Sequence, residues 1–564
     1  MKNKRPRMCA VIAAAAVARG LPGFAQTEKP QYGGSLDIGN VNYTVSPLSW
    51  DTGDWAWKTN QDALYLDQLF AGDLSKARRN GGKYRFTADS WLPSDAIRGE
   101  LAETWQWKEN PLRLEIVLRK GVMFPAKPGV MASRELVADD VVFSYQRLAK
   151  SAKRVADFLD HIDKVEATDR HTAVFTFNKY QSDWDYRFGW GYFSPIVAKE
   201  VVDAGATNWR NANGSGPFQL VDYIQGNSLV FAKNASYWDK ERIAGQEYAI
   251  PFVNRLTTRI IKDESTALTA LRTAKLDILE TVRWSAVDEL KQHAPALRWN
   301  RRLSTSGQYL SMRVDTKPFD DVRVRRALNM AVNKAEIVAK FYGGNAELFA
   351  FPQTPDFVGY HEPLEAMPES IEELYVYNPN KAKQLLAEAG YPMGFSFKVQ
   401  VCSCAPDLLD LIPLLVAYLE KVGVRVEVQQ MEYGALFSLM RSATNAAGLL
   451  VTNGFGNPTQ TLRKNFLKGQ YFDTSIWDDK AFEARLATVY TERDEAKQQV
   501  TVKALSREII DKAPYIWLPT PYVYTAWWPW VKNYEGELFV GSARAAPIYA
   551  RIWVDQAMKK KMGF

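Results

Sequence analysis

Two apolar strands separated by a helix constrain the fold of this chain more than any other feature. Residues 397–403 (FKVQVCS) and 424–431 (VRVEVQQM) read as strands, and residues 408–422 between them read as an amphipathic helix. A strand–helix–strand unit joins two parallel strands of one sheet. The sequence therefore predicts an α/β domain in the second half of the chain.

Two further helices in this half carry clear start signals. In residues 318–342 apolar side chains recur on one helical face up to Val338, and Asp320 and Asp321 stand where an N-cap belongs. In residues 377–392, Asn378 and Pro379 begin a helix that Gly390 closes. The first half is predicted to mix both element types, with strands at 41–45, 114–118, 172–177 and 228–233 and helices at 137–148 and 264–274.

The N-terminus has the three parts of a secretory signal. Basic residues precede an apolar run at 8–18, and Gly23, Phe24 and Ala25 then form a cleavage site with small residues at its outer positions. The run is too short to serve as a permanent membrane helix. We therefore predict that residues 1–25 are a cleaved signal peptide and that the mature protein is periplasmic.

Removal of this signal also removes most of the net charge. The chain of 564 residues has a formal charge of +7, and residues 1–25 hold five basic residues and no acidic ones, so the mature chain carries +2. This balance gives no reason to expect a nucleic-acid partner. With 46% hydrophobic residues, a chain of this length is expected to fold into several packed units.

No pattern in the chain indicates an enzyme. The four histidines, at 161, 171, 293 and 361, are too dispersed for a recognisable metal-binding pair, and no G-x-S-x-G motif occurs. The stretch GSGPF at 214–218 lacks the spacing of a phosphate loop and reads as a turn, while the acidic pairs at 139–140 and 320–321 read as helix caps. We predict no catalytic residues, no metal and no cofactor.

Two cysteines remain after the signal peptide, Cys402 and Cys404. On a strand they would point to the same face. An oxidising compartment permits a disulfide between them, whereas the separation of residues two apart is near the upper limit for such a bond. The sequence leaves both the disulfide and the free thiol pair open.

Six stretches, in order along the mature chain, share the pattern of one family. They are YGGSLDIGNVNYTVSPLSWD; LAETWQWKENPLRLEIVLRKGVMFPA followed by VADDVVFSYQRL; GSGPFQLVDYIQGNSLVFAKNASYWD; ESTALTALRTAKLDI; PFDDVRVRRALNMAVNKAEI; and YNPNKAKQLLAEAGYP. Together they resemble the family 5 solute-binding proteins of ABC importers, the type that binds oligopeptides and dipeptides.

The resemblance implies an α/β fold of two lobes, a periplasmic-binding-protein clamp of the class II type with an extra subdomain inserted in the first lobe. It places lobe I in residues 26–66, 180–283 and 516–564, the inserted subdomain in 67–179, and lobe II in 284–515. A small-molecule ligand would be captured between the lobes and delivered to ABC permease subunits in the inner membrane. We expect a monomer. An enzyme or a chaperone on the same clamp is the alternative.

The stretch LLVTNGFGNPTQ at 449–460 bears most directly on the ligand. Family peptide binders often hold the peptide amine with an Asp in a G-D-x-G-D-P loop, and the two acids of that pattern correspond here to Gly454 and Asn457. A buried ammonium without a countercharge costs roughly several kcal/mol. We therefore expect a peptide or oligosaccharide ligand that is not held by a free amine at this loop. An oligopeptide whose amine is held by a different acid is the alternative.

Candidate ligand contacts follow from this loop and from its expected neighbours. Asn453 and Asn457 offer amide donors and acceptors, and Phe455 offers an aromatic face. The alternative for both asparagines is that they only shape turns. The full set of predicted ligand contacts is Asn42, Tyr43, Trp284, Tyr309, Asn453, Gly454, Phe455 and Asn457.

Overall fold

The computed structural model describes residues 29–40, 49–53, 62–151, 159–192, 194–470 and 472–564. The predicted signal peptide, the strand expected at 41–45 and the candidate contacts Asn42 and Tyr43 lie outside these residues. Within the described ranges, no helix is both long and apolar enough to cross a membrane.

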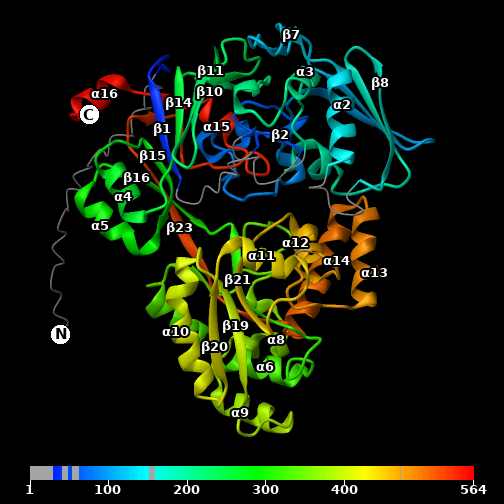
Figure 1. Cartoon of the computed structure of the whole chain (residues 1–564), viewed down its shortest axis with the longest axis vertical. Coiled ribbons are helices and arrows are strands. Elements are labelled where there is room, and N and C mark those ends of the chain that lie inside the picture. The colour runs from blue at the N-terminus through cyan, green and yellow to red at the C-terminus, as the bar shows by residue number, and fades with distance from the viewer. Residues whose placement is uncertain (1–28, 41–48, 54–61, 152–158, 193, 471) are drawn as a thin grey trace, which may run out of the picture.

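A large mixed sheet forms the centre of the first lobe, in the upper part of Figure 1. Its strand order is β10-β11-β14-β1-β15-β23-β16, and the short β18 pairs with β23. β1 runs parallel to β14 and β15, while β23 runs antiparallel to β15 and β16. The strands are β1 (Ser35–Asn40), β10 (Phe218–Ile224), β11 (Ser228–Lys233), β14 (Arg255–Ile260), β15 (Ile278–Arg283), β16 (Arg298–Leu303), β18 (Ala346–Glu347) and β23 (Thr520–Trp527).

A second sheet, of order β20-β19-β21-β17-β22, forms the centre of the second lobe. β19 pairs in parallel with β20, and α10 (Pro406–Glu420) connects them, so the predicted strand–helix–strand unit is confirmed. The strands are β17 (Ser306–Met312), β19 (Ser396–Cys402), β20 (Arg425–Met431), β21 (Gly448–Gly454) and β22 (Tyr515–Trp517). The helices around them include α6 (Val322–Ala331), α9 (Pro379–Glu388), α11 (Tyr433–Arg441), α12 (Pro458–Phe466), α13 (Lys480–Thr491) and α14 (Glu495–Asp511).

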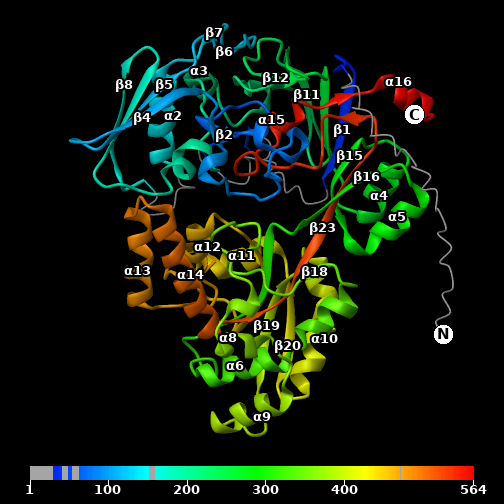
Figure 2. The ribbon, with the colours of Figure 1, turned by 180° about the vertical axis from the view of Figure 1, so that it is seen from behind.

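A smaller antiparallel sheet, of order β4-β5-β9-β8, lies beside the first sheet and is covered by a helix, α2. The residues involved fall inside the interval 67–179 in which we expect the inserted subdomain. The elements are β4 (Ala102–Lys108), β5 (Arg113–Leu118), α2 (Ala138–Ala149), β8 (Ile162–Asp169) and β9 (Thr172–Phe177). In Figure 2 this subdomain stands directly above α13 and α14 of the second lobe.

Apart from the two-residue β18, which pairs with the first residues of β23, the chain passes between the two large sheets at two points, after β16 and after β22. Each crossover is short, since β17 begins three residues after β16 ends and β23 begins three residues after β22 ends. The sequence-based start of lobe II at Trp284 differs from this arrangement, because β16 is hydrogen-bonded to β23 in the first sheet. We propose residues 304–305 and 518–519 as the lobe boundaries.

The helix predicted through Val338 is interrupted after ten residues. α6 ends at Ala331, and α7 (Lys334–Glu336) starts afresh with Asn333 as its N-cap, whose side chain accepts a hydrogen bond from the Glu336 amide. The buried Lys334 ammonium donates to the Asn329 carbonyl at 2.6 Å. The Lys334 side chain thus satisfies a backbone carbonyl near the end of α6. The apolar pattern in the sequence continues through this break and therefore gives no sign of it.

Candidate ligand-binding site

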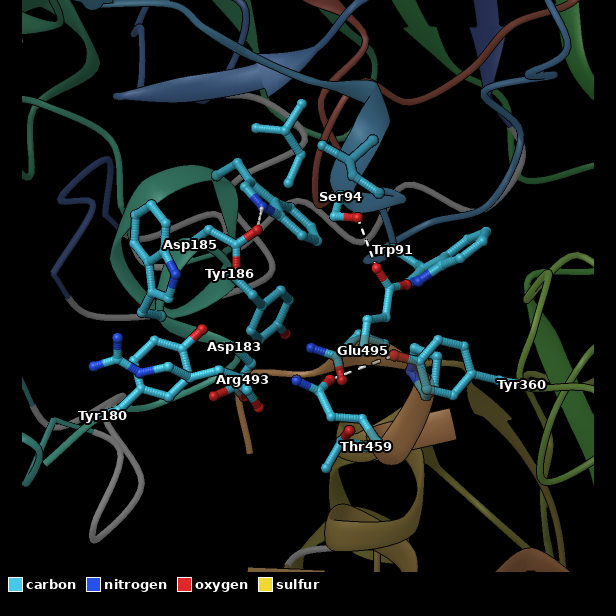
Figure 3. Close-up of a pocket in the computed structure, with 18 of the residues that line it drawn as sticks. Trp91, Ser94, Tyr180, Asp183, Asp185, Tyr186, Tyr360, Thr459, Arg493 and Glu495 are labelled. Carbon is cyan, nitrogen blue, oxygen red and sulfur yellow. Dashed lines mark hydrogen bonds between the residues drawn. The ribbon is translucent and has the colours of Figure 1, made fainter. Parts of the chain in front are cut away.

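Hydrogen bonds join the two lobes across the boundary between them. Gln460 Nε2, on α12 of the second lobe, donates to Asp183 Oδ2 of the first at 2.5 Å. Ser94 Oγ of the first lobe donates to Glu495 Oε2, at the start of α14, at 2.8 Å (Figure 3). The lobes therefore meet through direct polar contacts between side chains.

A cavity of about 340 Å³, here called the central cavity, lies between the lobes. The first lobe contributes polar and aromatic side chains, and the second contributes the end of β21, the loop after it, α11 and α12. From the first lobe the lining residues are Asp89, Ser90, Tyr186 and Tyr192; from the second they include Ser306, Cys402, Cys404, Tyr433, Leu436, Phe437, Met440, Asn453, Gly454, Phe455, Gln460, Lys464 and Phe472.

Figure 3 shows a second cavity of about 270 Å³, here called the peripheral cavity. Asp183 lines this cavity, whereas its hydrogen-bond partner Gln460 lines the central cavity. Tyr186 lines both cavities. Burial raises the pKa of Asp185 in its wall to about 6, although Trp190 Nε1 donates to this carboxylate at 2.9 Å. The wall combines rings with acids: Trp91, Trp105, Tyr180, Trp184, Tyr186, Trp190 and Tyr360 with Asp183, Asp185 and Glu495.

The loop after β21 is a strand-to-helix turn. Asn457 is the N-cap of α12, and its Oδ1 accepts a hydrogen bond from the Gln460 amide at 2.8 Å. Pro458 occupies the first helical turn, where its missing amide hydrogen is no loss. The side-chain oxygen of Asn457 therefore shapes the turn, as the alternative for this residue predicts. Asn457 also forms part of the wall of the peripheral cavity.

Asn453 and Tyr309 belong to one buried network behind the central cavity. Asn453 Nδ2 and Tyr309 Oη both donate to Asn465 Oδ1, at 2.6 and 3.0 Å. The Tyr309 ring is fully buried and stacks on Tyr515, with ring centroids 4.1 Å apart. Asn453 reaches the central cavity, whereas Tyr309 supports the wall from behind.

Phe455 and Gly454 form the part of the wall that lies directly at the loop. The Phe455 ring packs against Phe351 and Phe357, with ring centroids 5.7 and 5.9 Å away, so it is largely a buried support. A Cβ built on Gly454 would lie 3.9 Å from Ser306 Oγ and meet nothing closer. A Cβ at position 454 would therefore meet ordinary van der Waals contacts and no clash.

Lys464, on α12, is a lining residue that sequence analysis did not single out. Its ammonium donates a hydrogen bond to the Gly454 carbonyl and lies 5.6 Å from the centre of the Phe472 ring. Burial lowers the pKa of Lys464 to about 8, and the Asp89 carboxylate across the cavity opposes this shift. Its position seven residues, or about two helical turns, beyond the N-cap Asn457 was the only signal available in the sequence.

Asp89 is the acid of the first lobe in the wall of the central cavity. Its carboxylate accepts hydrogen bonds from Tyr192 Oη at 2.5 Å, from the Ala543 amide at 2.8 Å and from Ser90 Oγ at 3.2 Å. Burial raises the pKa of Asp89, and these hydrogen bonds oppose that rise. The acid is thus held by donors of its own lobe.

Cys402 and Cys404 form a disulfide with Cα atoms 5.0 Å apart, which resolves the question that their spacing leaves open. The bond lies at the carboxyl end of β19, just before α10, and both residues line the central cavity. The remaining candidate, Trp284, lies away from the central and peripheral cavities and packs against Phe341 and Tyr342.

Comparisons with known proteins agree with this architecture. Heme-binding protein A of Haemophilus influenzae is 27% identical over 383 residues, which cover 64% of this chain and 67% of that protein. Di/tripeptide-binding protein 2 of Pseudomonas aeruginosa is 25% identical over 454 residues, covering 76% and 81%. The ABC transporter-associated periplasmic binding protein DppA of Helicobacter pylori, solved with the peptide STSA, superposes with a TM-score of 0.74 at 22% identity, covering 93% of this chain and 99% of that one.

The solved structure confirms the two-lobed clamp predicted from the resemblance. The profile of the family described as "Bacterial extracellular solute-binding proteins, family 5 Middle" matches residues 96–473, which is more than half of the chain. The matched interval holds the four-stranded sheet β4-β5-β9-β8 with α2, the first crossover and the cavity loop. The chain therefore belongs to the bacterial extracellular solute-binding proteins of family 5.

Proposed function

We propose that this protein captures a small organic solute between its lobes in the periplasm and delivers it to the permease subunits of an ABC importer. The central cavity carries the proposal, because its wall is built by both lobes. Such a cavity is complete only when the lobes are together, so ligand binding and closure are coupled. The Helicobacter pylori protein, described as ABC transporter-associated, supports the same role for this chain.

The size and wall of the central cavity favour a peptide-like or oligosaccharide-sized fragment. Its volume of about 340 Å³ falls in the range of small-molecule sites. Tyr433 and Phe437 stack with centroids 5.9 Å apart beside the cavity and offer a flat apolar surface. At Gly454 the loop offers no carboxylate, so a free ammonium is not the anchor at this point.

A second candidate ligand is a peptide whose amine binds Asp89. The location of this acid in the wall of the central cavity favours it. Its three protein donors and the nearby Lys464 charge oppose it, because an incoming ammonium would have to displace those hydrogen bonds and lie close to a like charge.

The test is a thermal-shift and calorimetric screen of di- to tetrapeptides, their N-acetylated forms, and neutral and acidic disaccharides. Ligand that binds the folded state raises the melting temperature by mass action. We expect N-acetylated peptides or sugars to bind at least as well as free peptides. Strong binding of free peptides alone, lost on Asp89→Asn, would establish the second candidate instead; binding of none of the compounds would contradict capture of such solutes.

The same screen on Tyr433→Ala tests whether the central cavity is the binding site. Tyr433 is 38% exposed, so its truncation disturbs the fold little, whereas truncation of the buried Phe455 would leave a void that costs about 3–5 kcal/mol. We expect the dissociation constant to rise about tenfold with an unchanged circular dichroism spectrum. Val376→Ala, on an exposed residue away from the cavity wall, is the matched control.

A further inference from the structure

Two charged side chains, Asp89 and Lys464, occur among the described residues that line the central cavity. They come from different lobes, and each affects the other through space. Their bonding differs sharply. The Asp89 carboxylate receives hydrogen bonds from Tyr192, Ala543 and Ser90, whereas the Lys464 ammonium donates to one carbonyl.

Lys464 therefore has donors to spare. An ammonium carries three N–H groups, and the Gly454 carbonyl takes one of them. Within the described part of the chain, no carboxylate lies within ion-pair distance of its Nζ. Burial of a cation is costly, the Asp89 carboxylate offsets part of this cost through space, and an anion that binds in contact with the ammonium would offset more of it. The aliphatic stem meanwhile lies against the Phe472 ring.

Space for that anion exists next to the ammonium. Gly454 and Lys464 both line the central cavity, and a Cβ built at position 454 would lie 3.9 Å from its nearest non-neighbouring atoms, so the wall at this point is not crowded. The loop that lacks an acid and the lysine that has no carboxylate at ion-pair distance among the described residues are joined by one hydrogen bond. A carboxylate brought by the ligand can occupy the place of the missing side chain.

We infer that the solute is anionic and that Lys464 binds its carboxylate or a comparable oxyanion through the ammonium N–H groups that do not donate to the Gly454 carbonyl. This inference rests on the proposed function and specifies its ligand. The remainder of the solute lies along Tyr433, Phe437 and the Cys402–Cys404 disulfide, which form the less polar wall of the same cavity. The charges at this site are thereby the reverse of those in a peptide binder: a cationic lysine binds an anionic group of the ligand, whereas an acidic loop binds a cationic amine.

The experiment compares pairs of compounds that differ only in charge. The pairs are N-acetyl-leucyl-leucine with its C-terminal amide, and cellobionate with cellobiose; sodium sulfate and phosphate are tested against sodium chloride at equal ionic strength. Binding is measured by calorimetry and thermal shift at pH 7 on the wild-type protein and on three variants. Lys464→Met removes the charge and Lys464→Arg keeps it. Lys468→Met is the control, because it removes an exposed lysine just beyond α12 that pairs with Asp478 and does not line the cavity.

We expect the acid of at least one pair to bind wild-type protein tenfold or more tightly than its neutral partner. Lys464→Met should abolish this preference, while Lys464→Arg and Lys468→Met should keep it. Gly454→Asp supplies an independent check, because a carboxylate there would pair with Lys464 and should abolish the preference without removing the lysine.

Equal binding of the acid and its neutral partner, or a preference that survives both Lys464→Met and Gly454→Asp, would overturn the inference. If no organic compound binds, the proposed function fails by itself. The inorganic arm then decides about the site: a sulfate or phosphate shift that depends on Lys464 supports an oxyanion site, and the absence of such a shift refutes it.

Discussion

Lys464 and Lys334 illustrate how the surroundings of a buried ammonium indicate its role. Burial lowers the pKa of both, to about 8 and about 7. Lys334 donates to the carbonyls of Asn329 and Leu374, at 2.6 and 2.7 Å, and is enclosed by protein. Lys464 has one carbonyl acceptor and faces a cavity. The first is a structural link between chain segments, and the second has bonding capacity left for a ligand.

The pKa of Lys464 predicts how anion binding depends on pH. An anion binds the protonated lysine, so binding takes up a proton wherever the free protein has lost it. The pKa of Lys464 in the protein without ligand is about 8. The association constant should therefore be nearly constant below pH 7 and should fall as the pH rises through 8, with a slope that approaches tenfold per pH unit. Calorimetry with whichever acid binds in the screen, from pH 6.5 to 9.5, measures this.

Other groups at the cavity do not mimic this pH effect. Burial raises the pKa of Tyr186, Tyr192 and Tyr433, so these rings stay neutral through the range, and the carboxylate of the probe stays ionised. Asp89 is the acid that faces Lys464. Lys464→Arg provides the control, because arginine remains protonated and should give a flat profile. A profile that falls equally in Lys464→Arg would assign the pH dependence to another group.

At the scale of elements, local sequence signals account for helix ends. Asn378 accepts a hydrogen bond from the Lys381 amide at 3.0 Å, and Pro379 opens α9, as the sequence predicts. Asn378→Ala should lower the free energy of unfolding by about 1 kcal/mol, since an amide at the start of α9 loses its acceptor. Urea denaturation measures this change. Asn378→Ser should be nearly neutral, and an equal loss in both variants would contradict a capping role.

The elements that could be predicted are those whose causes lie within a few residues. The periodicity of β19, α10 and β20 and the caps of α6 and α9 are of this kind. The break after α6 was missed because Lys334 acts through the Asn329 and Leu374 carbonyls, and the second of these lies 40 residues away.

The site was harder to predict than the fold, because its contacts join residues that are far apart in the sequence. The loop that contains Gly454 could be recognised by its sequence, but its facing residue Asp89 belongs to the other lobe, more than 350 positions earlier. Tyr309 and Trp284 were reasonable candidates by position near the crossover. The structure turns both toward aromatic neighbours instead, because large rings gain most from burial.

At the scale of the whole molecule, the Gln460–Asp183 hydrogen bond links the lobes at the boundary between the two cavities. Gln460→Ala should favour the open arrangement, because one charge-assisted bond of the closed state is lost while Asp183 keeps Arg187. We expect a dissociation constant about tenfold or more higher, and a larger radius of gyration by small-angle X-ray scattering at subsaturating ligand.

An exposed glutamine offers the comparison for this variant. Gln384 donates to Glu388 within α9, far from the lobe boundary, so Gln384→Ala should change neither the affinity nor the scattering. Identical scattering and affinity for Gln460→Ala and wild type would show that this contact does not contribute to closure.

The open space above Gly454 also has a genetic consequence. Glycine and aspartate codons differ at the second base when the third is a pyrimidine, so a single nucleotide change can place a carboxylate beside Lys464. Because a Cβ at this position meets no clash and the backbone does not require glycine, we expect the substitution to be tolerated without compensating mutations. One transition could thus cancel the charge of the cavity, and ligand preference within this lineage can diverge faster than the fold that supports it.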